Sequence, residues 1–407
     1  MKTISLKNIW TLVLSLIAAF PLLPKVVESI LMIVFFILSI ILYFKRDKGI
    51  LKHNNNLKDI LLLSSLFVIY LLSSLYSDNY VESLRFIILA APILMFPLCL
   101  GFFYDTEISS KQFRRIKIVY ITSLFLSLLI THFHLSYTVT DTISNWNYRN
   151  LFEDYTRVHG TYYSLWIGFG ILILINEIFK KKRSNRIFYY LPFLVLIGYF
   201  FYWQITIAAR LPLFITSILG MLYIVKQLKK THRLLIISLF GFACVFYIFL
   251  KFDSIKSKIK FDLPEGKYAL QHKDMTSEEI RTGIYYCSTS LIKNSLLFGY
   301  GVGDVNDQLN ICYKQKIKSD VYQLFHYNSH NQYFQVFLAA GLFGILFFFF
   351  NIFNIFNISI RNKDELFIMF NLLLFTGFLT ENILSRHDGV IFYSYFVNLF
   401  YFQKRKR

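Results

Sequence analysis

Two arginines and one histidine lie where a charged or titratable side chain is unusual. Arg210 lies in a short turn between two apolar stretches, Arg281 follows a predicted helix start at 276–279, and His330 lies in the polar block 326–333. An arginine close to apolar surroundings is costly and usually has an anionic partner or a polar cavity. An imidazole titrates near neutrality and can act as a general base. These residue types predict a site that binds an anion and accepts a proton.

Each of the three residues also has a structural interpretation. Arg210 would extend its charge to the interface between membrane and water. Arg281 would pair with Glu278 on the same helix, and a surface histidine is often inert. We favour a functional role for Arg210, because no other charge lies near it in the sequence. For Arg281 taken alone, the pair with Glu278 is the simpler explanation.

Other standard sites are absent from the sequence. It contains no H-E-x-x-H, G-x-S-x-G or Walker A motif, and no two aspartates stand two positions apart. Gly299, Gly301 and Gly303 are spaced like a phosphate loop, but they follow a predicted helix and not a strand. We therefore expect these glycines to end that helix, and we predict neither a metal nor a cofactor.

The composition predicts a membrane protein. The chain has 407 residues, of which 56% are hydrophobic and 16% are charged. A soluble domain is nearer half apolar and a quarter charged, and disorder requires low hydrophobicity. The net charge is +19, but the basic residues form short clusters at alternate gaps between apolar stretches. This is the positive-inside pattern of a multi-pass protein and not a nucleic-acid-binding groove.

Twelve apolar stretches are long enough to cross a bilayer, which takes about 20 mostly apolar residues. We expect an all-α polytopic fold with both termini and every basic cluster in the cytoplasm. The first stretch lacks a small-residue cleavage site, so we interpret it as a retained signal anchor. The expected spans are 8–24, 27–44, 59–76, 84–104, 118–136, 160–179, 187–206, 210–225, 234–251, 332–358, 366–384 and 389–403.

The gaps between spans divide the chain into three parts. Residues 1–251 hold nine spans, 252–331 form a large outer loop, and 332–407 hold three spans and a basic tail. A loop of this length usually has a function. Within it, Thr276 is the expected N-cap of an amphipathic helix. The apolar face of that helix would lie either on the membrane surface or over the loop's own core, and the sequence leaves both open.

The four cysteines fall into two pairs. Cys99 and Cys244 lie inside expected spans, where we expect them only to pack. Cys287 and Cys312 both lie in the outer loop. If that side is a periplasm, they can form a disulfide, although the sequence does not show their distance.

The stretch 206–384 also carries several short motifs. Arg210 opens a span, and the loop helix with Arg281 leads into 297–304. The most specific motif is the block His-Asn-x-Tyr at 330–333, which is followed by Gly-Leu-x-Gly at 341–344 and later by Glu381. Together these elements resemble the O-antigen ligase and polymerase superfamily of bacterial membrane glycosyltransferases. The resemblance covers most of the chain, and one departure is Ala209, where serine is frequent.

This resemblance implies that a glycan linked to undecaprenyl pyrophosphate is transferred to an acceptor hydroxyl at the periplasmic face of the inner membrane. In ligases the acceptor is a sugar of the lipid A core. Arg210 and Arg281 would hold the diphosphate, since a guanidinium binds oxyanions in a bidentate way and stays charged. His330 would act as the base, and a single displacement would invert the anomeric centre without a metal. Further substrate contacts would come from Asn328, Asn331, Tyr333, Arg157, His159, Tyr162 and Glu381.

The implied partners are the lipid-linked donor, the lipid A core or glycan acceptor and membrane lipid, but not nucleic acid. A polymerase of the same superfamily, or a transferase that glycosylates protein, remains an alternative. A more remote alternative is a transporter of the lipid-linked glycan. Transporters place their charges near the midplane on broken helices, often in inverted repeats, whereas here the candidate residues cluster on one side and no repeat is found.

Overall fold

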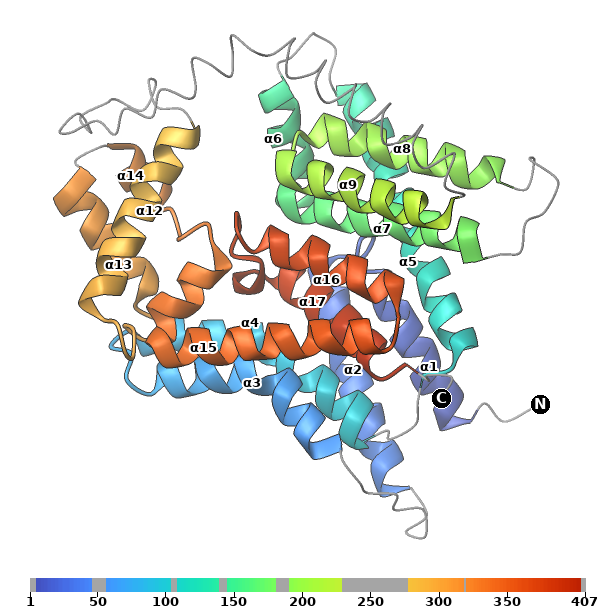
Figure 1. Ribbon diagram of the computed structural model, residues 1–407, viewed down its shortest axis with the longest axis horizontal. Coiled ribbons are helices and arrows are strands. Elements are labelled where there is room, and N and C mark those ends of the chain that lie inside the picture. Colours follow the sequence, from blue (N-terminus) through green and yellow to red (C-terminus); the bar gives the residue numbers. More distant parts are fainter. Residues whose placement is uncertain are drawn as a thin grey trace.

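The computed structural model is built of α-helices (Figure 1). It describes residues 5–45, 56–103, 108–138, 145–180, 190–228, 277–317 and 320–403. Within these ranges the single extended pairing is an isolated bridge between Ile108 and Gln403. The all-α fold class predicted from the sequence is confirmed.

Six of the described helices are long and apolar enough to cross a membrane, and they make the chain a multi-pass membrane protein. They are α2 (Lys25–Phe44), α3 (Asn56–Ser74), α4 (Tyr80–Pro97) with its π-helical continuation Leu98–Phe103, α5 (Ser110–Thr138), α7 (Gly160–Lys180) and α15 (Gln332–Arg361). Shorter helices complete the bundle: α1 (Leu6–Ile17), α8 (Leu191–Ile207), α9 (Arg210–Gln227), α16 (Glu365–Gly377) and α17 (His387–Tyr401).

Eleven of the twelve expected spans coincide with these helices. The ninth, 234–251, lies outside the described residues together with Cys244 and Thr276, so the count of twelve stays a prediction. Two differences matter for the site. The span expected at 366–384 ends at Gly377, which leaves a mostly irregular segment before α17. The outer gap before α7 also holds the helix α6 (Asn145–Thr156).

Helix α7 lies at the centre of the bundle. Its residues from Gly160 to Asn176 are all buried, and α5, α8, α9, α16 and α17 pack around it. Small residues at helix contacts let backbones approach closely in membranes. Gly168 is such a residue, because a Cβ there would overlap the hydroxyl of Thr216 on α9. This packing fixes the helices on which the candidate residues lie.

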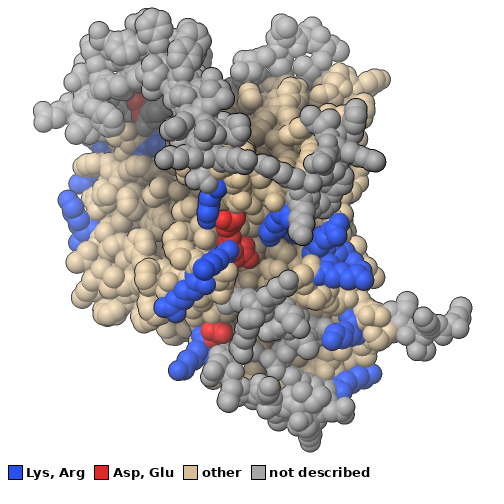
Figure 2. Space-filling view, turned by 45° about the vertical axis from the view of Figure 1, so that its right-hand side comes forward, with Lys and Arg blue, Asp and Glu red and all other residues tan. Residues whose placement is uncertain are grey.

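The contacts between connecting segments fall at two ends of the bundle. Figure 1 places the outer-loop helices at the left and both chain ends at the right. Described residues that flank the gaps expected in the cytoplasm contact one another. On the face turned forward in Figure 2, Lys and Arg outnumber Asp and Glu. The contacts at this end are Tyr401 with Asp59 (2.6 Å), Ile108 with Phe402 (3.1 Å) and Lys226 with Glu365 (2.6 Å).

The part of the outer loop that the structure describes, from 277 onward, folds over a small core. It contains α12 (Ser277–Asn294), α13 (Val305–Cys312), a π-helical turn (Tyr313–Ile317) and α14 (Asp320–Phe325). The apolar face of α12 includes the buried residues Ile284, Cys287 and Leu291, and it packs against α13 and α15. Of the two alternatives left open by the sequence, the structure therefore shows the loop core. Cys287 and Cys312 form a disulfide within it.

The three glycines after α12 do not end that helix, which corrects the expectation from the sequence. Helix α12 ends at Asn294, and the glycines instead let the loop approach other backbone closely. Tyr300 N–H donates to the carbonyl of Leu338 at 2.7 Å, and Gly301 N–H donates to Ala339 at 3.0 Å. These carbonyls are accessible because α15 is broken at Gly341, which has φ 63° and ψ −158°. A Cβ at Gly341 would overlap the backbone of Leu297.

The loop is also attached to the turn between α3 and α4. Asp304 lies directly before α13 without capping it. Its carboxylate instead accepts hydrogen bonds from Ser77 Oγ, Asp78 N–H and Asn79 N–H, each at 2.8 Å. A carboxylate surrounded by three donors is a strong, charge-assisted anchor. The outer loop is therefore fixed to both α15 and the α3–α4 turn.

Candidate functional site

His330 and Glu381 lie side by side at the outer end of the bundle. Nδ1 of His330 is 3.3 Å from Oε2 of Glu381. His330 lies in the segment that leads into α15, and Glu381 lies in the irregular segment between α16 and α17. The Glu381 side chain is 6% exposed and that of His330 is 20% exposed. The carboxylate therefore lies behind the imidazole, which remains partly accessible.

Arg281 reaches the same carboxylate from the outer loop. Its Nη2 lies 3.6 Å from Oε1 of Glu381, and its side chain is 41% exposed. Tyr285, one turn further along α12, donates its hydroxyl to the carbonyl of Leu379 at 3.2 Å. Its ring also meets that of Phe334 edge to face, with centroids 5.5 Å apart. Helix α12 is thus held against the segment that contains Glu381, and Glu381 joins Arg281 to His330.

The backbone that carries His330 is unusual and is held by nearby amides. His330 has φ 40°, in the left-handed region, which is uncommon for residues other than glycine. Its N–H donates to Oδ1 of Asn328 at 3.0 Å. Asn331 caps α15 by accepting from the N–H groups of Tyr333 and Phe334. In this structure Asn328 and Asn331 therefore position the His330 backbone, and their role as substrate ligands stays a prediction.

Asn382 is a buried connecting residue that the sequence analysis did not identify. Its Oδ1 accepts from Asn331 N–H at 2.7 Å and from Ser329 Oγ at 3.1 Å. Its Nδ2 donates to Gln335 Oε1 at 3.0 Å, and its own carbonyl accepts from the hydroxyl of Tyr162. Asn382 thus ties the His330 segment, α15 and α7 together. The signal was the adjacent polar pair 381–382 inside an apolar stretch, of which only the glutamate was noted.

The segment before α7 lies close to this network. His159 and Tyr162 meet edge to face, with ring centroids 5.7 Å apart, and the Arg386 guanidinium lies 5.9 Å from the Tyr162 ring centre. Arg157 is exposed, and its carbonyl accepts from Lys25 Nζ at 3.0 Å. The structure thus places Tyr162 against Asn382 and leaves Arg157 at the edge. Tyr333 stacks on Phe349 and donates to the carbonyl of Phe375, and its role as a substrate ligand stays a prediction.

Arg210 lies on a neighbouring helix. It is the first residue of α9, exposed, and follows Ala208 in a left-handed conformation. Helix α9 packs against α16, which leads to the Glu381 segment. The contacts above join His330, Arg281 and Glu381, while the approach of Arg210 to that group stays a prediction.

The charges of the site follow from burial and neighbours. Burial alone would raise the pKa of Glu381, but His330, His159 and Arg281 outweigh it and hold the pKa below its usual value of 4.5. Burial lowers the pKa of His159 below its usual 6.5, against the opposing charges of Glu381 and Glu153. At neutral pH the site therefore combines a charged Glu381 with a neutral His159. In the described part of the chain no cluster of three His, Cys, Asp or Glu residues could hold a metal ion.

Comparison with known proteins agrees with the resemblance inferred from the sequence. Residues 192–349 match the family model described as O-Antigen ligase. The matched stretch contains Arg210, Arg281 and His330, while Glu381 lies beyond its end. No curated protein matches the sequence. The family match and the membrane helices indicate a membrane enzyme of the O-antigen ligase or polymerase type.

Proposed function

We propose that the chain is a glycosyltransferase of the ligase type. It moves a glycan from undecaprenyl pyrophosphate to a hydroxyl of a lipid A core sugar. The observation that carries the proposal is the position of Glu381, in contact with both His330 and Arg281. In this proposal His330 is the proton acceptor and Arg281 the anion-binding group, and both contact one buried carboxylate.

His330 acts as the general base. Its Nδ1 lies 3.3 Å from the carboxylate of Glu381, and in this proposal the imidazole carries its proton on Nδ1 and offers Nε2 to the acceptor. A carboxylate behind a histidine holds the ring in the reactive tautomer and stabilises the imidazolium that forms. The acceptor oxygen gives its proton to Nε2 and forms a bond to the anomeric carbon. The bond from that carbon to the diphosphate oxygen breaks in the same step.

Arg281 and Arg210 bind the departing diphosphate. A guanidinium has five N–H donors, so the contact of Arg281 with Glu381 leaves donors for phosphate oxygens. Arginine keeps its charge and matches phosphate geometry in a bidentate way. Charge that develops on the leaving oxygens is stabilised by such fixed donors. A diphosphate needs little protonation to leave, and one displacement inverts the anomeric centre without a covalent intermediate.

The reaction takes place at the periplasmic face of the inner membrane. Support comes from the contacts among described residues that flank the basic gaps, such as Tyr401 with Asp59, which lie apart from the contacts of the candidate site. The positive-inside rule assigns the basic end to the cytoplasm. A disulfide in the outer loop is expected in an oxidising compartment.

Glycolipid analysis of a deletion strain tests the proposal. Loss of a ligase leaves core without polymer, while polymer accumulates on the carrier lipid. Single repeat units on the core would identify a polymerase instead. Wild-type protein and a His326→Asn variant should restore the normal pattern, whereas Arg281→Lys should not, because an ammonium lacks the planar fork. Unchanged glycolipids in the deletion strain would refute both activities.

A further inference from the structure

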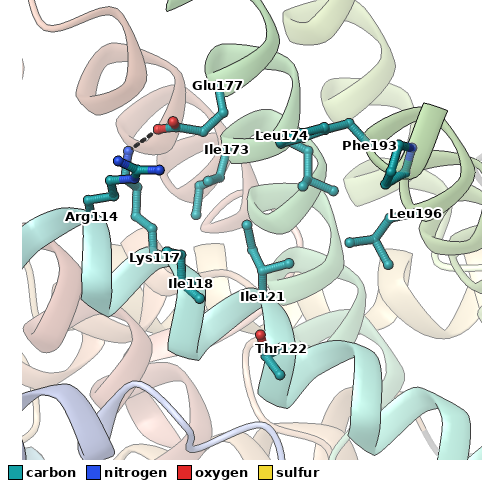
Figure 3. Close-up of a pocket in the computed structure, with 11 residues that line it drawn as sticks. Arg114, Lys117, Ile118, Ile121, Thr122, Ile173, Leu174, Glu177, Phe193 and Leu196 are labelled. Atoms are coloured by element: carbon teal, nitrogen blue, oxygen red, sulfur yellow. Dashed lines mark hydrogen bonds and ion pairs between the residues drawn. The ribbon is translucent and has the colours of Figure 1, made fainter. Parts of the chain in front are cut away.

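A crevice opens between α5, α7 and α8, at the end of the bundle away from the candidate site. Its volume is about 260 Å³, below the roughly 300–1,000 Å³ typical of pockets that enclose a small molecule. Its size therefore suits part of a narrow hydrocarbon chain. Figure 3 shows its walls, with α5 opposite α7 and α8. The lining residues include Arg114, Lys117, Ile118, Ile121, Glu177 and Leu196.

The ionisable groups of the crevice all lie at one end. Arg114 lies near the start of α5, Glu177 lies near the end of α7, and α8 begins at Leu191. The charged residues thus lie at the end of the crevice near the basic segments. Aliphatic side chains such as Ile121 and Leu196 line the crevice further toward the membrane interior. Ile118 is 55% exposed, so the crevice is accessible from the lipid-facing side of α5. This order, charge first and apolar wall after, matches the order of groups in a phospholipid.

Among the described residues, basic groups are in small excess at that end, where Lys180 and Asp364 also act on Lys117. Lys117 forms an ion pair with Glu177, drawn as a dashed line in Figure 3, and the two charges cancel. Arg114 lies one turn before Lys117, is exposed and has no acidic partner among the described residues. An arginine at a membrane-facing crevice that no carboxylate of the described residues contacts is stabilised by an anion or by water. A basic pocket between transmembrane helices is a typical site for an anionic lipid headgroup.

We propose that this crevice binds an anionic phospholipid of the adjacent leaflet, with the phosphate on Arg114 and one acyl chain between α5 and α8. The Lys117–Glu177 pair closes the headgroup end and holds α5 to α7. Bound lipid fills the gap between α5 and α8 and stabilises the packing of α5 on the bundle. The inference concerns lipid binding alone and does not depend on the transferase activity.

Native mass spectrometry of the full-length protein, titrated with dioleoylphosphatidylglycerol or dioleoylphosphatidylcholine, tests the proposal. The wild type should retain phosphatidylglycerol in preference to phosphatidylcholine. Arg114→Ala should weaken phosphatidylglycerol binding about fivefold, which corresponds to about 1 kcal/mol for one basic residue near the surface. The matched control is Arg115→Ala, since Arg115 is exposed on the same helix turn but does not line the crevice.

A second pair of variants tests the apolar wall. Leu196→Trp should fill the crevice and weaken phosphatidylglycerol binding at least threefold without changing the charge. Leu194→Trp, at an exposed position outside the crevice, should leave binding unchanged. If Leu196→Trp does not give folded protein, Ile121→Phe serves in its place. Equal effects of Arg114→Ala and Arg115→Ala, equal retention of both lipids, or unchanged binding in folded Leu196→Trp would each overturn the proposal.

Discussion

The carboxylate of Glu381 lies 3.3 Å from Nδ1 of His330, and its second oxygen faces Arg281. The two residues are brought together by α15 and α16, which lie between them in the chain. Glu381 was expected to contact substrate. Its nearly complete burial and its contact with Nδ1 support our proposal that it positions His330, while a contact with substrate stays a prediction.

Replacing His330 should abolish transfer. His330→Asn is the suitable variant, because asparagine tolerates the left-handed backbone at this position. Loss of a general base typically costs about 10²–10⁴-fold in rate, and we expect this loss in kcat with purified protein, lipid-linked donor and acceptor. The control is His326→Asn, since His326 also has a positive φ but lies outside the network. Turnover near the wild-type rate in His330→Asn would remove this residue as the base.

Replacing Glu381 should impair the same step indirectly. Glu381→Gln keeps the shape of the side chain but offers no charge to the His330 ring, so we expect kcat to fall at least about tenfold. The largest expected loss is about 10⁴-fold, as for amide substitution in other histidine–carboxylate pairs. The acceptor KM should change little, and the pH dependence of kcat should shift. Glu365→Gln, at the other end of the bundle, is the control. A rise in KM with unchanged kcat would instead indicate a substrate ligand.

Acid should remove a stabilising contribution from Glu381. Its pKa is lowered in the folded protein, so the charged form stabilises the fold above the usual value of 4.5, and this contribution is lost as the pH falls through the lowered pKa. The Tm of Glu381→Gln should therefore lie below that of the wild type at pH 7, and the difference should shrink in melts below about pH 4.5. A difference that stays constant, or grows with acid, would contradict the assigned charge state.

The disulfide should stabilise the outer loop. It closes a loop with a sequence separation of 25 residues, and bridges of this kind contribute about 2–4 kcal/mol. Dithiothreitol should lower the Tm of the wild type, and also of a Cys99→Ala variant, since Cys99 is a free buried cysteine. The double variant Cys287→Ser/Cys312→Ser should already show the lower Tm and not respond to reductant. Because α12 carries Arg281, transfer activity should fall together with stability.

Asp304 should control how firmly the outer loop is attached. Asp304→Asn replaces one carboxylate oxygen by an NH₂ group. In either orientation of the amide, this group faces an N–H or O–H donor and cannot accept its hydrogen bond. Loss of one such charge-assisted bond costs about 1.5–3 kcal/mol. Hydrogen exchange over 295–317 should become faster. Asp307→Asn, which affects one more exposed bond to Asn79, should have a small effect, and equal exchange in both variants would argue against the anchor.

The sequence identified the helices well because burial in a membrane imposes long apolar windows. It also named His330, Arg281 and Glu381 as candidates. It did not predict the contact of Glu381 with His330, because that contact depends on where α16 ends, and the apolar window continues past Gly377. Asn382 was missed for the same reason, since its partners come from distant parts of the chain.

The glycines at 299–303 show a second limit. Glycine is used both to end helices and to let backbones approach closely, and the sequence alone does not separate the two. Here the partner is the broken segment of α15, which is distant in sequence. The side on which α12 packs was equally undecided, because an amphipathic face has the same pattern over a loop core as on a bilayer.

The break at Gly341 has a consequence for hybrid enzymes. The loop at 296–301 completes the hydrogen bonds of α15 on both sides of Gly341. The loop and this part of α15 should therefore come from the same parent protein. A chimera that takes only the loop from a relative would pair that loop with an α15 of different sequence. Crossover points placed after residue 344 keep the loop and the first part of α15 from the same parent.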